Sequence, residues 1–215
     1  IINIPGFYDE IINHSTQSRE KINSAPFDLD QFKSHISIGS EHGEWGYSTT
    51  ERIGIRPTLD VNGIWGGYTG DGSKTVLPSK AFAKISMRLV PNQSSKKITK
   101  LFTDHLKSLC PDSCSIKIQE HHGGEPVVVN TDTKGYNAAF QAFKEIWGKE
   151  PIPTYDGGSI PIVSHFKKEL DRDSILMGFG LDEDAIHSQN ESFGLFNFYK
   201  GIETITSFYL NFAKK

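Results

Sequence analysis

The chain has 215 residues, with 23 basic and 26 acidic side chains and a formal charge of −3 at pH 7. Charged residues make up 23% of it and hydrophobic residues 36%, a composition that excludes general disorder. No run of basic residues would follow a phosphate backbone, so we expect no nucleic-acid partner. No apolar stretch approaches the roughly 18 residues of a membrane span, so we expect no membrane partner either.

The two cysteines, Cys110 and Cys114, flank a Pro-Asp-Ser turn whose spacing would permit a disulfide bond. We expect two free thiols in a reducing compartment instead, which favours a cytoplasmic location. The sequence opens at Ile1 with neither Met nor a signal peptide, so we expect part of the protein to precede it.

Residues 1–56 are rich in turn-forming residues, and we expect irregular structure there, apart from a short helix over about 28–37. From residue 57 the pattern changes. Alternating apolar and polar residues predict strands over 58–64 and 81–90, and the glycine-rich stretch 66–72 predicts a loop between them.

Ser94 or Ser95 is placed to cap a helix over 96–109, where four apolar residues share one face. Alternation over 115–119 predicts a further strand. Strands on both sides of one helix predict a small α/β sandwich with its helices on one face.

After a break at 121–126, the spacing predicts a helix over 133–147, a buried segment over 160–166, a strand over 174–180 and a closing helix over 196–212. In the closing helix we expect the packing face to be formed by Phe198, Ile202, Ile205, Phe208 and Tyr209. This order is typical of a layered α/β domain, although the sheet that it implies lacks partner strands in the chain.

The loop 67–75 has the composition of a phosphate-binding loop. Such a loop needs glycine directly before its lysine, and here Ser73 separates Gly72 from Lys74. No helix opens after the loop to hold an anion at its N-terminus. We therefore expect a turn that places Thr75 beside a partner surface.

His121 and His122 are adjacent, so on a strand their side chains would point to opposite faces and at most one would serve a function. The following stretch of interest is Gly157-Gly158-Ser159, whose N–H groups and hydroxyl could bind a carboxylate or an oxyanion. An ordinary Gly-Gly turn is the alternative interpretation.

Arg88 lies on a predicted strand, where arginine usually faces solvent but is also the best bidentate clamp for a carboxylate. His187 follows the predicted strand at 174–180, and strand ends are where ligands gather in layered α/β domains. Its imidazole is a sound transition-metal ligand, with acidic residues nearby at 182–184. A zinc site needs three or four ligands, and the chain offers this one convincing candidate.

Five segments in this order closely resemble the carnosine-type dipeptidases: 70–78, 88–92, 122–124, 157–161 and 185–191. They read GDGSKTVLP, RLVPN, HGG, GGSIP and AIHSQNE. These dipeptidases belong to a wider family of di-zinc metallopeptidases that includes carboxypeptidase G, aminoacylase, acetylornithine deacetylase and succinyl-diaminopimelate desuccinylase.

The resemblance implies an α/β protein of two domains. Residues 1–119 would be most of a lid domain that also forms a homodimer, with an irregular insertion at 1–56. Residues 120–215 would be the C-terminal part of a layered α/β catalytic domain.

The resemblance also implies roles for single residues. His187 would be a terminal ligand to one of two divalent metal ions, zinc or manganese. Arg88 would clamp the free carboxylate of a small peptide or N-acyl amino acid, with His122 and Ser159 lining the same pocket. Thr75 would reach from the lid toward the active site of the partner subunit.

The family's other metal ligands, its Glu-Glu pair with the general base and its lid histidine are absent from the sequence. We therefore expect the chain to be the C-terminal half of a metal-dependent dipeptidase or related amide hydrolase, inactive by itself. The alternative is a non-catalytic module that dimerises and binds carboxylates.

Overall fold

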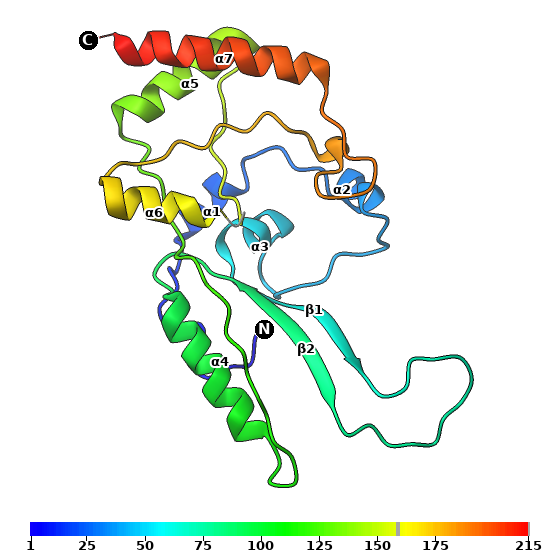
Figure 1. The fold of residues 1–215 in the computed structure, drawn as a ribbon. Coiled ribbons are helices and arrows are strands. Elements are labelled where there is room, and N and C mark those ends of the chain that lie inside the picture. The colour runs from blue at the N-terminus through cyan, green and yellow to red at the C-terminus, as the bar shows by residue number, and fades with distance from the viewer. Residues whose placement is uncertain (158–159, 215) are drawn as a thin grey trace.

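The computed structural model describes residues 1–157 and 160–214. The chain has an α/β fold in which a two-stranded hairpin projects from a mainly helical body (Figure 1). The first helices are α1 (Thr16–Ile22), α2 (Leu29–His35) and α3 (Thr49–Ile55). After the hairpin come α4 (Ser95–Leu109), α5 (Lys134–Trp147), α6 (Pro161–Leu170), the 3₁₀ turn η1 (Asp182–Asp184) and α7 (Leu195–Ala213).

The hairpin consists of β1 (Thr58–Gly66) and β2 (Ala81–Arg88), as the alternation predicts. The strands pair antiparallel, and Arg88 at the end of β2 lies opposite Thr58 at the start of β1, with a register shift between 61 and 63. This pairing fixes Arg88 at the base of the hairpin, where the strands join the helical body (Figure 1).

The base of the hairpin packs into a small core together with the N-terminal segment and α4. The buried centre of this core is formed by Ile4, Phe7 and Ile98, with Leu59, Met87, Leu89, Leu101 and Phe102 packed around it. Gln93 fixes the turn into α4, because its amide donates to the carbonyl of Phe7 and accepts from the N–H of Val90. The helix predicted over 96–109 is confirmed as α4.

Residues 1–56 are more ordered than the sequence predicts. The helix expected over 28–37 is present as α2, and the side chain of Asp28 caps it by accepting from the N–H groups of Asp30 and Gln31. The interpretation of the rest as irregular is wrong, since α1 and α3 also form. Each has only seven residues, and each begins at a serine N-cap. Helices this short show little apolar periodicity in the sequence, so the serine caps are their clearest signal.

The strand predicted over 115–119 is wrong, because that stretch has no ladder hydrogen bonds to any strand in the described residues. The chain instead runs back along α4 to its beginning, where the Glu125 carboxylate accepts from the N–H and hydroxyl of Ser95. An alternating pattern becomes a strand only when a neighbour supplies the other half of the ladder.

The two long C-terminal helices are confirmed, and α5 packs against α7 (Figure 1). The expected packing face of α7 is wrong. Its buried residues are small or polar: Asn197, Gly201, Thr204 and Ser207. Helix α7 packs against α5, whose buried residues are alanines. The apolar residues expected inside are largely exposed, including Phe198, Ile202 and Tyr209.

The two segments between these helices also differ from the prediction. The stretch expected to be buried at 160–166 is mostly the exposed helix α6, with Pro161 in its first turn and Val163 its one buried residue. The stretch expected as a strand at 174–180 is extended but pairs with no strand in the described residues. Both predictions needed a larger sheet than the described part of the chain contains.

None of the described helices is long and apolar enough to cross a membrane.

Candidate substrate-binding site

Arg88 ends strand β2 with its side chain exposed, at the base of the hairpin. Within residues 1–157 and 160–214 its guanidinium has no ion pair and no hydrogen-bond partner, whereas Arg19 and Arg56 are both held by carboxylates. An arginine without a partner keeps its full capacity to bind a carboxylate through two parallel hydrogen bonds.

Gly157 packs directly against this arginine. A Cβ atom at Gly157 would lie 2.8 Å from Cδ and 3.0 Å from Nη1 of Arg88, and 2.7 Å from the carbonyl oxygen of Ile53. A side chain is therefore excluded at this position. Two candidates separated by about seventy residues in the sequence, Arg88 and Gly157, thus meet in the fold.

The segment that follows His122 lies against the start of α6. A Cβ atom at Gly124 would lie 3.1 Å from Cβ of Pro161, the first residue of α6. The N-terminus of α6 carries the positive end of the helix dipole, which favours a carboxylate nearby. His122 is exposed two residues before this contact.

The other two residues predicted for this site are Ser159 and Thr75. Ser159 lies outside the described residues, so the prediction for its hydroxyl stays a prediction. Thr75 is exposed in the long loop between β1 and β2, which extends away from α6 in Figure 1.

His187 lies in the loop after η1, and η1 lies near α2, where Nε2 of His35 is 3.9 Å from the carboxylate of Glu183 (Figure 1). The side chain of His187 is exposed, and its backbone N–H donates to the carboxylate of Glu191 at 3.3 Å. Ala185, His187 and Asn190 all have positive φ, which is uncommon for residues with side chains.

The described residues do not form a metal centre by themselves. No group of three or more His, Cys, Asp or Glu side chains comes together within residues 1–157 and 160–214. His187 is thus a single candidate ligand, which is fewer than a bound zinc ion requires.

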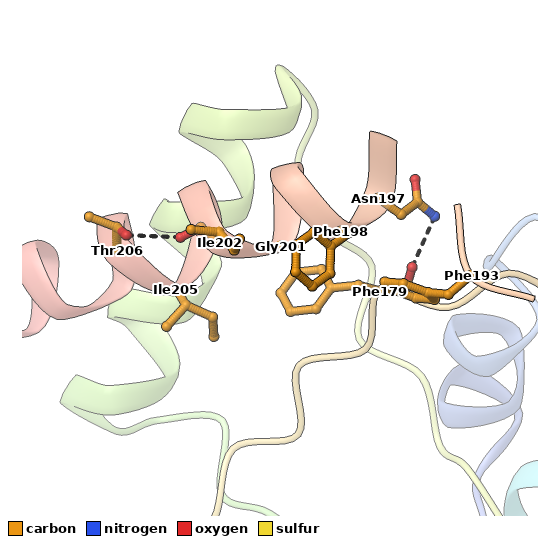
Figure 2. A pocket seen from close by; sticks show the side chains of 8 residues that line it. All are labelled: Phe179, Phe193, Asn197, Phe198, Gly201, Ile202, Ile205 and Thr206. Carbon is orange, nitrogen blue, oxygen red and sulfur yellow. Dashed lines mark hydrogen bonds between the residues drawn. The ribbon is translucent and has the colours of Figure 1, made fainter. Parts of the chain in front are cut away.

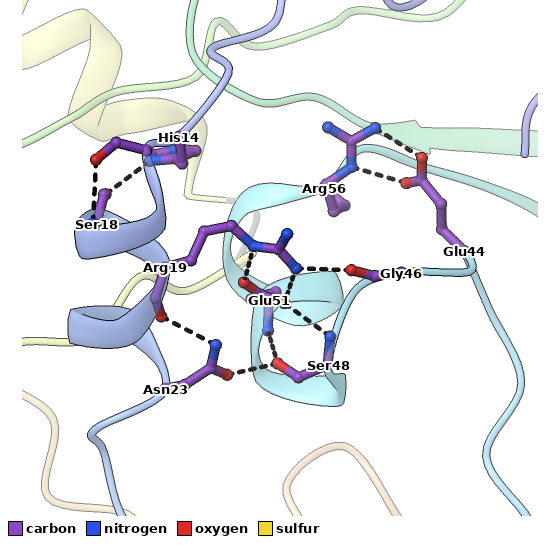
Figure 3. Close-up of polar contacts among 10 residues, drawn as sticks. His14, Ser18, Arg19, Asn23, Glu44, Gly46, Ser48, Glu51 and Arg56 are labelled. Atoms are coloured by element: carbon purple, nitrogen blue, oxygen red, sulfur yellow. Dashed lines mark hydrogen bonds and ion pairs between the residues drawn. The ribbon is translucent and has the colours of Figure 1, made fainter.

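The sequence interpretation missed the residues that support the glycine turn. Glu51 is almost fully buried at 1% exposure and binds Arg19 through two hydrogen bonds of 2.5 and 2.9 Å (Figure 3). Its signal was present as Ser48-Thr-Thr-Glu51, because serine followed three residues later by glutamate is a capping box. Glu44 similarly pairs with both Nε and Nη2 of buried Arg56 at 2.7 Å.

A separate pocket of about 360 Å³ lies against α7, and Figure 2 shows its lining. The lining is mainly aromatic and aliphatic, with Phe179, Phe198 and Ile202 prominent. Its two polar side chains are Asn197 and Thr206, and the Asn197 amide donates to the carbonyl of Phe179. The pocket holds no titratable side chain, so its lining cannot carry acid–base chemistry.

Residues 12–114 match the sequence profile of the peptidase dimerisation domain found in the M20 family. The chain is 29% identical to human Beta-Ala-His dipeptidase over 98% of its own length, and 30% identical to the Cys-Gly metallodipeptidase DUG1 of Candida albicans over 99%. It superposes on an M20 family metallo-carboxypeptidase from Sulfolobus solfataricus with a TM-score of 0.86, at 29% identity over 98% of the chain.

Residues 12–114 thus form an M20 peptidase dimerisation domain, and the chain's relatives and structural neighbours are metallodipeptidases and M20 metallopeptidases. The family predicted from the five segments is thereby confirmed, as is the α/β fold. The chain spans 42% and 44% of the two dipeptidases and 48% of the carboxypeptidase, so it corresponds to less than half of each.

Proposed function

We propose that this M20 chain supplies the substrate-carboxylate site and the dimerisation surface of a metal-dependent dipeptidase. The substrate is a small peptide or N-acyl amino acid with a free carboxylate. The observation that carries the proposal is the guanidinium of Arg88, which has no partner among the described residues and lies against Gly157, four residues before α6 begins. A guanidinium and a helix N-terminus both favour an anion, and the relatives that cover nearly all of the chain are named as dipeptidases.

In this proposal Arg88 binds the carboxylate, and His122 and Ser159 line the same pocket. Thr75, in the hairpin loop, reaches the active site of a second subunit. The two-domain division follows, with residues 1–119 as the lid and dimerisation domain and 120–215 as part of the catalytic domain. The dimerisation profile, which ends at residue 114, supports this boundary.

We also propose a homodimer that forms through the hairpin. Val61, Ile64 and Phe82 of the two strands are exposed apolar residues, and a two-stranded sheet has open edges on both sides. Exposed apolar side chains beside an unpaired strand edge favour association with another chain. Sedimentation velocity of the full-length gene product checks the dimer.

We propose a cytoplasmic location for the protein. The free thiols of Cys110 and Cys114 support it, because a reducing compartment keeps thiols free.

We propose two divalent metal ions, zinc or manganese, as cofactors of the complete enzyme, with His187 as one ligand. The left-handed backbone of its loop supports a special role for that segment. Since the described residues form no site for these ions, we assign no step of the reaction to them.

The full-length gene product that carries this chain should hydrolyse dipeptides, lose the activity on treatment with a chelator and regain it with zinc or manganese. The His187→Ala variant should retain less bound metal, measured by elemental analysis. His165→Ala, which changes an exposed histidine of α6, is the matched control.

Absence of dipeptide hydrolysis in the metal-loaded full-length product would overturn the proposed function and favour the non-catalytic module. Full metal occupancy in His187→Ala would remove His187 from the ligand set and leave the activity proposal standing.

A further inference from the structure

Helix α3 lies directly under the turn that meets Arg88. A Cβ atom at Gly54 would lie 2.9 Å from Cβ and 2.9 Å from the carbonyl oxygen of Tyr155. Real Cβ atoms do not approach so closely, so even alanine at residue 54 would push this segment away. The backbone of α3 thereby sets the position of Tyr155.

Gly157 continues the same contact toward Arg88. It lies between the carbonyl oxygen of Ile53, in α3, and the Arg88 side chain, with no room for a methyl group on either side. The order of contact is therefore α3, then the 155–157 segment, then the guanidinium. A shift of α3 would reach Gly157 through the backbone carbonyl of Ile53, and Gly157 in turn touches Cδ and Nη1 of the Arg88 side chain.

Helix α3 is itself held firmly in place. Glu51 accepts from the N–H of its N-cap residue Ser48 at 2.8 Å and from Arg19 of α1, as Figure 3 shows. Asn23 joins the two helices again by accepting from the hydroxyl of Ser48 at 2.6 Å. On the other side of the turn, the ring of His14 meets the ring of Tyr155 edge to face at 6.2 Å.

We propose that α3, through Gly54, is the positioning element of the carboxylate site, holding Gly157 against Arg88 so that the guanidinium faces the substrate's carboxylate. This inference rests on the proposed function. It gives the N-terminal 56 residues a purpose: they support substrate recognition from beneath. Gly54 is a positioning residue, since it acts on Arg88 through the 155–157 segment.

The test compares Gly54→Ala with wild type in the full-length, metal-loaded product, using a dipeptide and the same dipeptide as its C-terminal amide. We expect KM for the free acid to rise about tenfold, with kcat within about threefold, because displacement by a fraction of an ångström misaligns a bidentate contact. The amide, which lacks the carboxylate, should be little affected. Gly39→Ala is the matched control, because a Cβ at Gly39 meets nothing within 4 Å.

A double-mutant cycle makes the test specific. In an Arg88→Met background, Gly54→Ala should have no further effect on KM for the free acid, because both changes act on one contact. If Gly54→Ala does not fold, Gly157→Ala, which presses on Arg88 from the same turn, should show the same selective loss.

Equal losses on the acid and the amide, or independent effects of the two substitutions, would overturn the inference. These outcomes require an active wild type, so they are distinct from failure of the proposed function, in which wild type hydrolyses no dipeptide.

Discussion

Glu51 is the most deeply buried carboxylate in the described part of the chain. Hydrogen bonds from Arg19 and from the N–H of Ser48 lower its pKa to about 2, from 4.5, although burial alone would raise it. Buried carboxylates keep their charge only when donors surround them, and here the donors come from two helices. The charge of Glu51 is therefore part of what joins α1 to α3.

This lowered pKa predicts a specific dependence of stability on pH. The stabilisation from ionised Glu51 is present above the unfolded-state pKa near 4.5 and is lost as the pH falls from 4.5 toward 2. Glu51→Gln should lower the free energy of unfolding by about 1–3 kcal/mol at pH 7, since a shift of this size corresponds to roughly 3 kcal/mol and the half-exposed Arg19 is partly screened.

Urea unfolding of the full-length product at pH 7 and at pH 3 measures the difference. Glu20→Gln, an exposed position on α1, is the matched control and should change little. A gap between wild type and Glu51→Gln that stays constant between the two pH values would show that the ionised side chain contributes nothing.

Helix α7 has two faces with opposite character. The face packed on α5 is lined by small and polar residues, and the opposite side exposes aromatic rings such as Phe198 and Tyr209. Small residues let the two helix backbones approach closely, as the buried Ala138, Ala139 and Ala142 of α5 do from the other side. Packing between these helices thus depends on shape and hydrogen bonds more than on large apolar side chains.

Thr204 is the polar centre of this helix pair. Its side chain has no exposed surface; its hydroxyl accepts from Nε1 of Trp147 at 3.0 Å and donates to the carbonyl of Lys200 at 2.7 Å. Thr204→Val keeps the shape but leaves the indole N–H without its partner, so we expect a loss of about 1–3 kcal/mol in unfolding free energy. Denaturant unfolding monitored by tryptophan fluorescence measures it.

Thr206→Val on the same helix is the control for Thr204→Val. Its hydroxyl makes the same bond to a carbonyl four residues earlier, but the side chain is exposed and no α5 residue of the described structure bonds to it. It should change stability by no more than about 0.5 kcal/mol. Equal effects of the two substitutions would show that the bond to Trp147 is without consequence.

Elements whose signal is local could be predicted from the sequence. The strands ending at Gly66 and Arg88 alternate strongly, and α4, α5 and α7 repeat their apolar residues at helical spacing, so each pattern specifies its own structure. The stretches 115–119 and 174–180 alternate as well, but a strand also needs a neighbour, which a local pattern cannot supply. The period of α7 likewise predicts a helix without telling which face is covered.

The candidate site divides in the same way. Arg88 and Gly157 were predicted from their residue types and the resemblance, because each is unusual at its position in the sequence. The role of Gly54 could not be predicted, since it rests on a contact with Tyr155 about a hundred residues away. For α3 the only local signal was the capping box from Ser48 to Glu51, and seven residues gave too short a period to recognise.

Across the whole molecule, the charges and glycines of three distant segments converge on the base of the hairpin. Helix α3 contacts the segment 155–157, and β2 ends at Arg88, whose side chain meets Gly157 of that segment. The apolar hairpin extends from this base in one direction and the α5–α7 pair lies in the other. This arrangement separates the surface proposed for dimerisation from the residues proposed to bind substrate.

The measurement that tests this account most directly is kcat/KM of the full-length, metal-loaded product for a dipeptide and for its C-terminal amide, in wild type and in Arg88→Met. Lys84→Met, an exposed lysine on the same strand, is the control for loss of a positive charge. We predict that Arg88→Met lowers kcat/KM for the free acid by about 10- to 100-fold, as expected for a charge-assisted hydrogen-bonded pair, and changes the amide less than about threefold. Equal losses on both substrates, or no loss on either, would contradict the account.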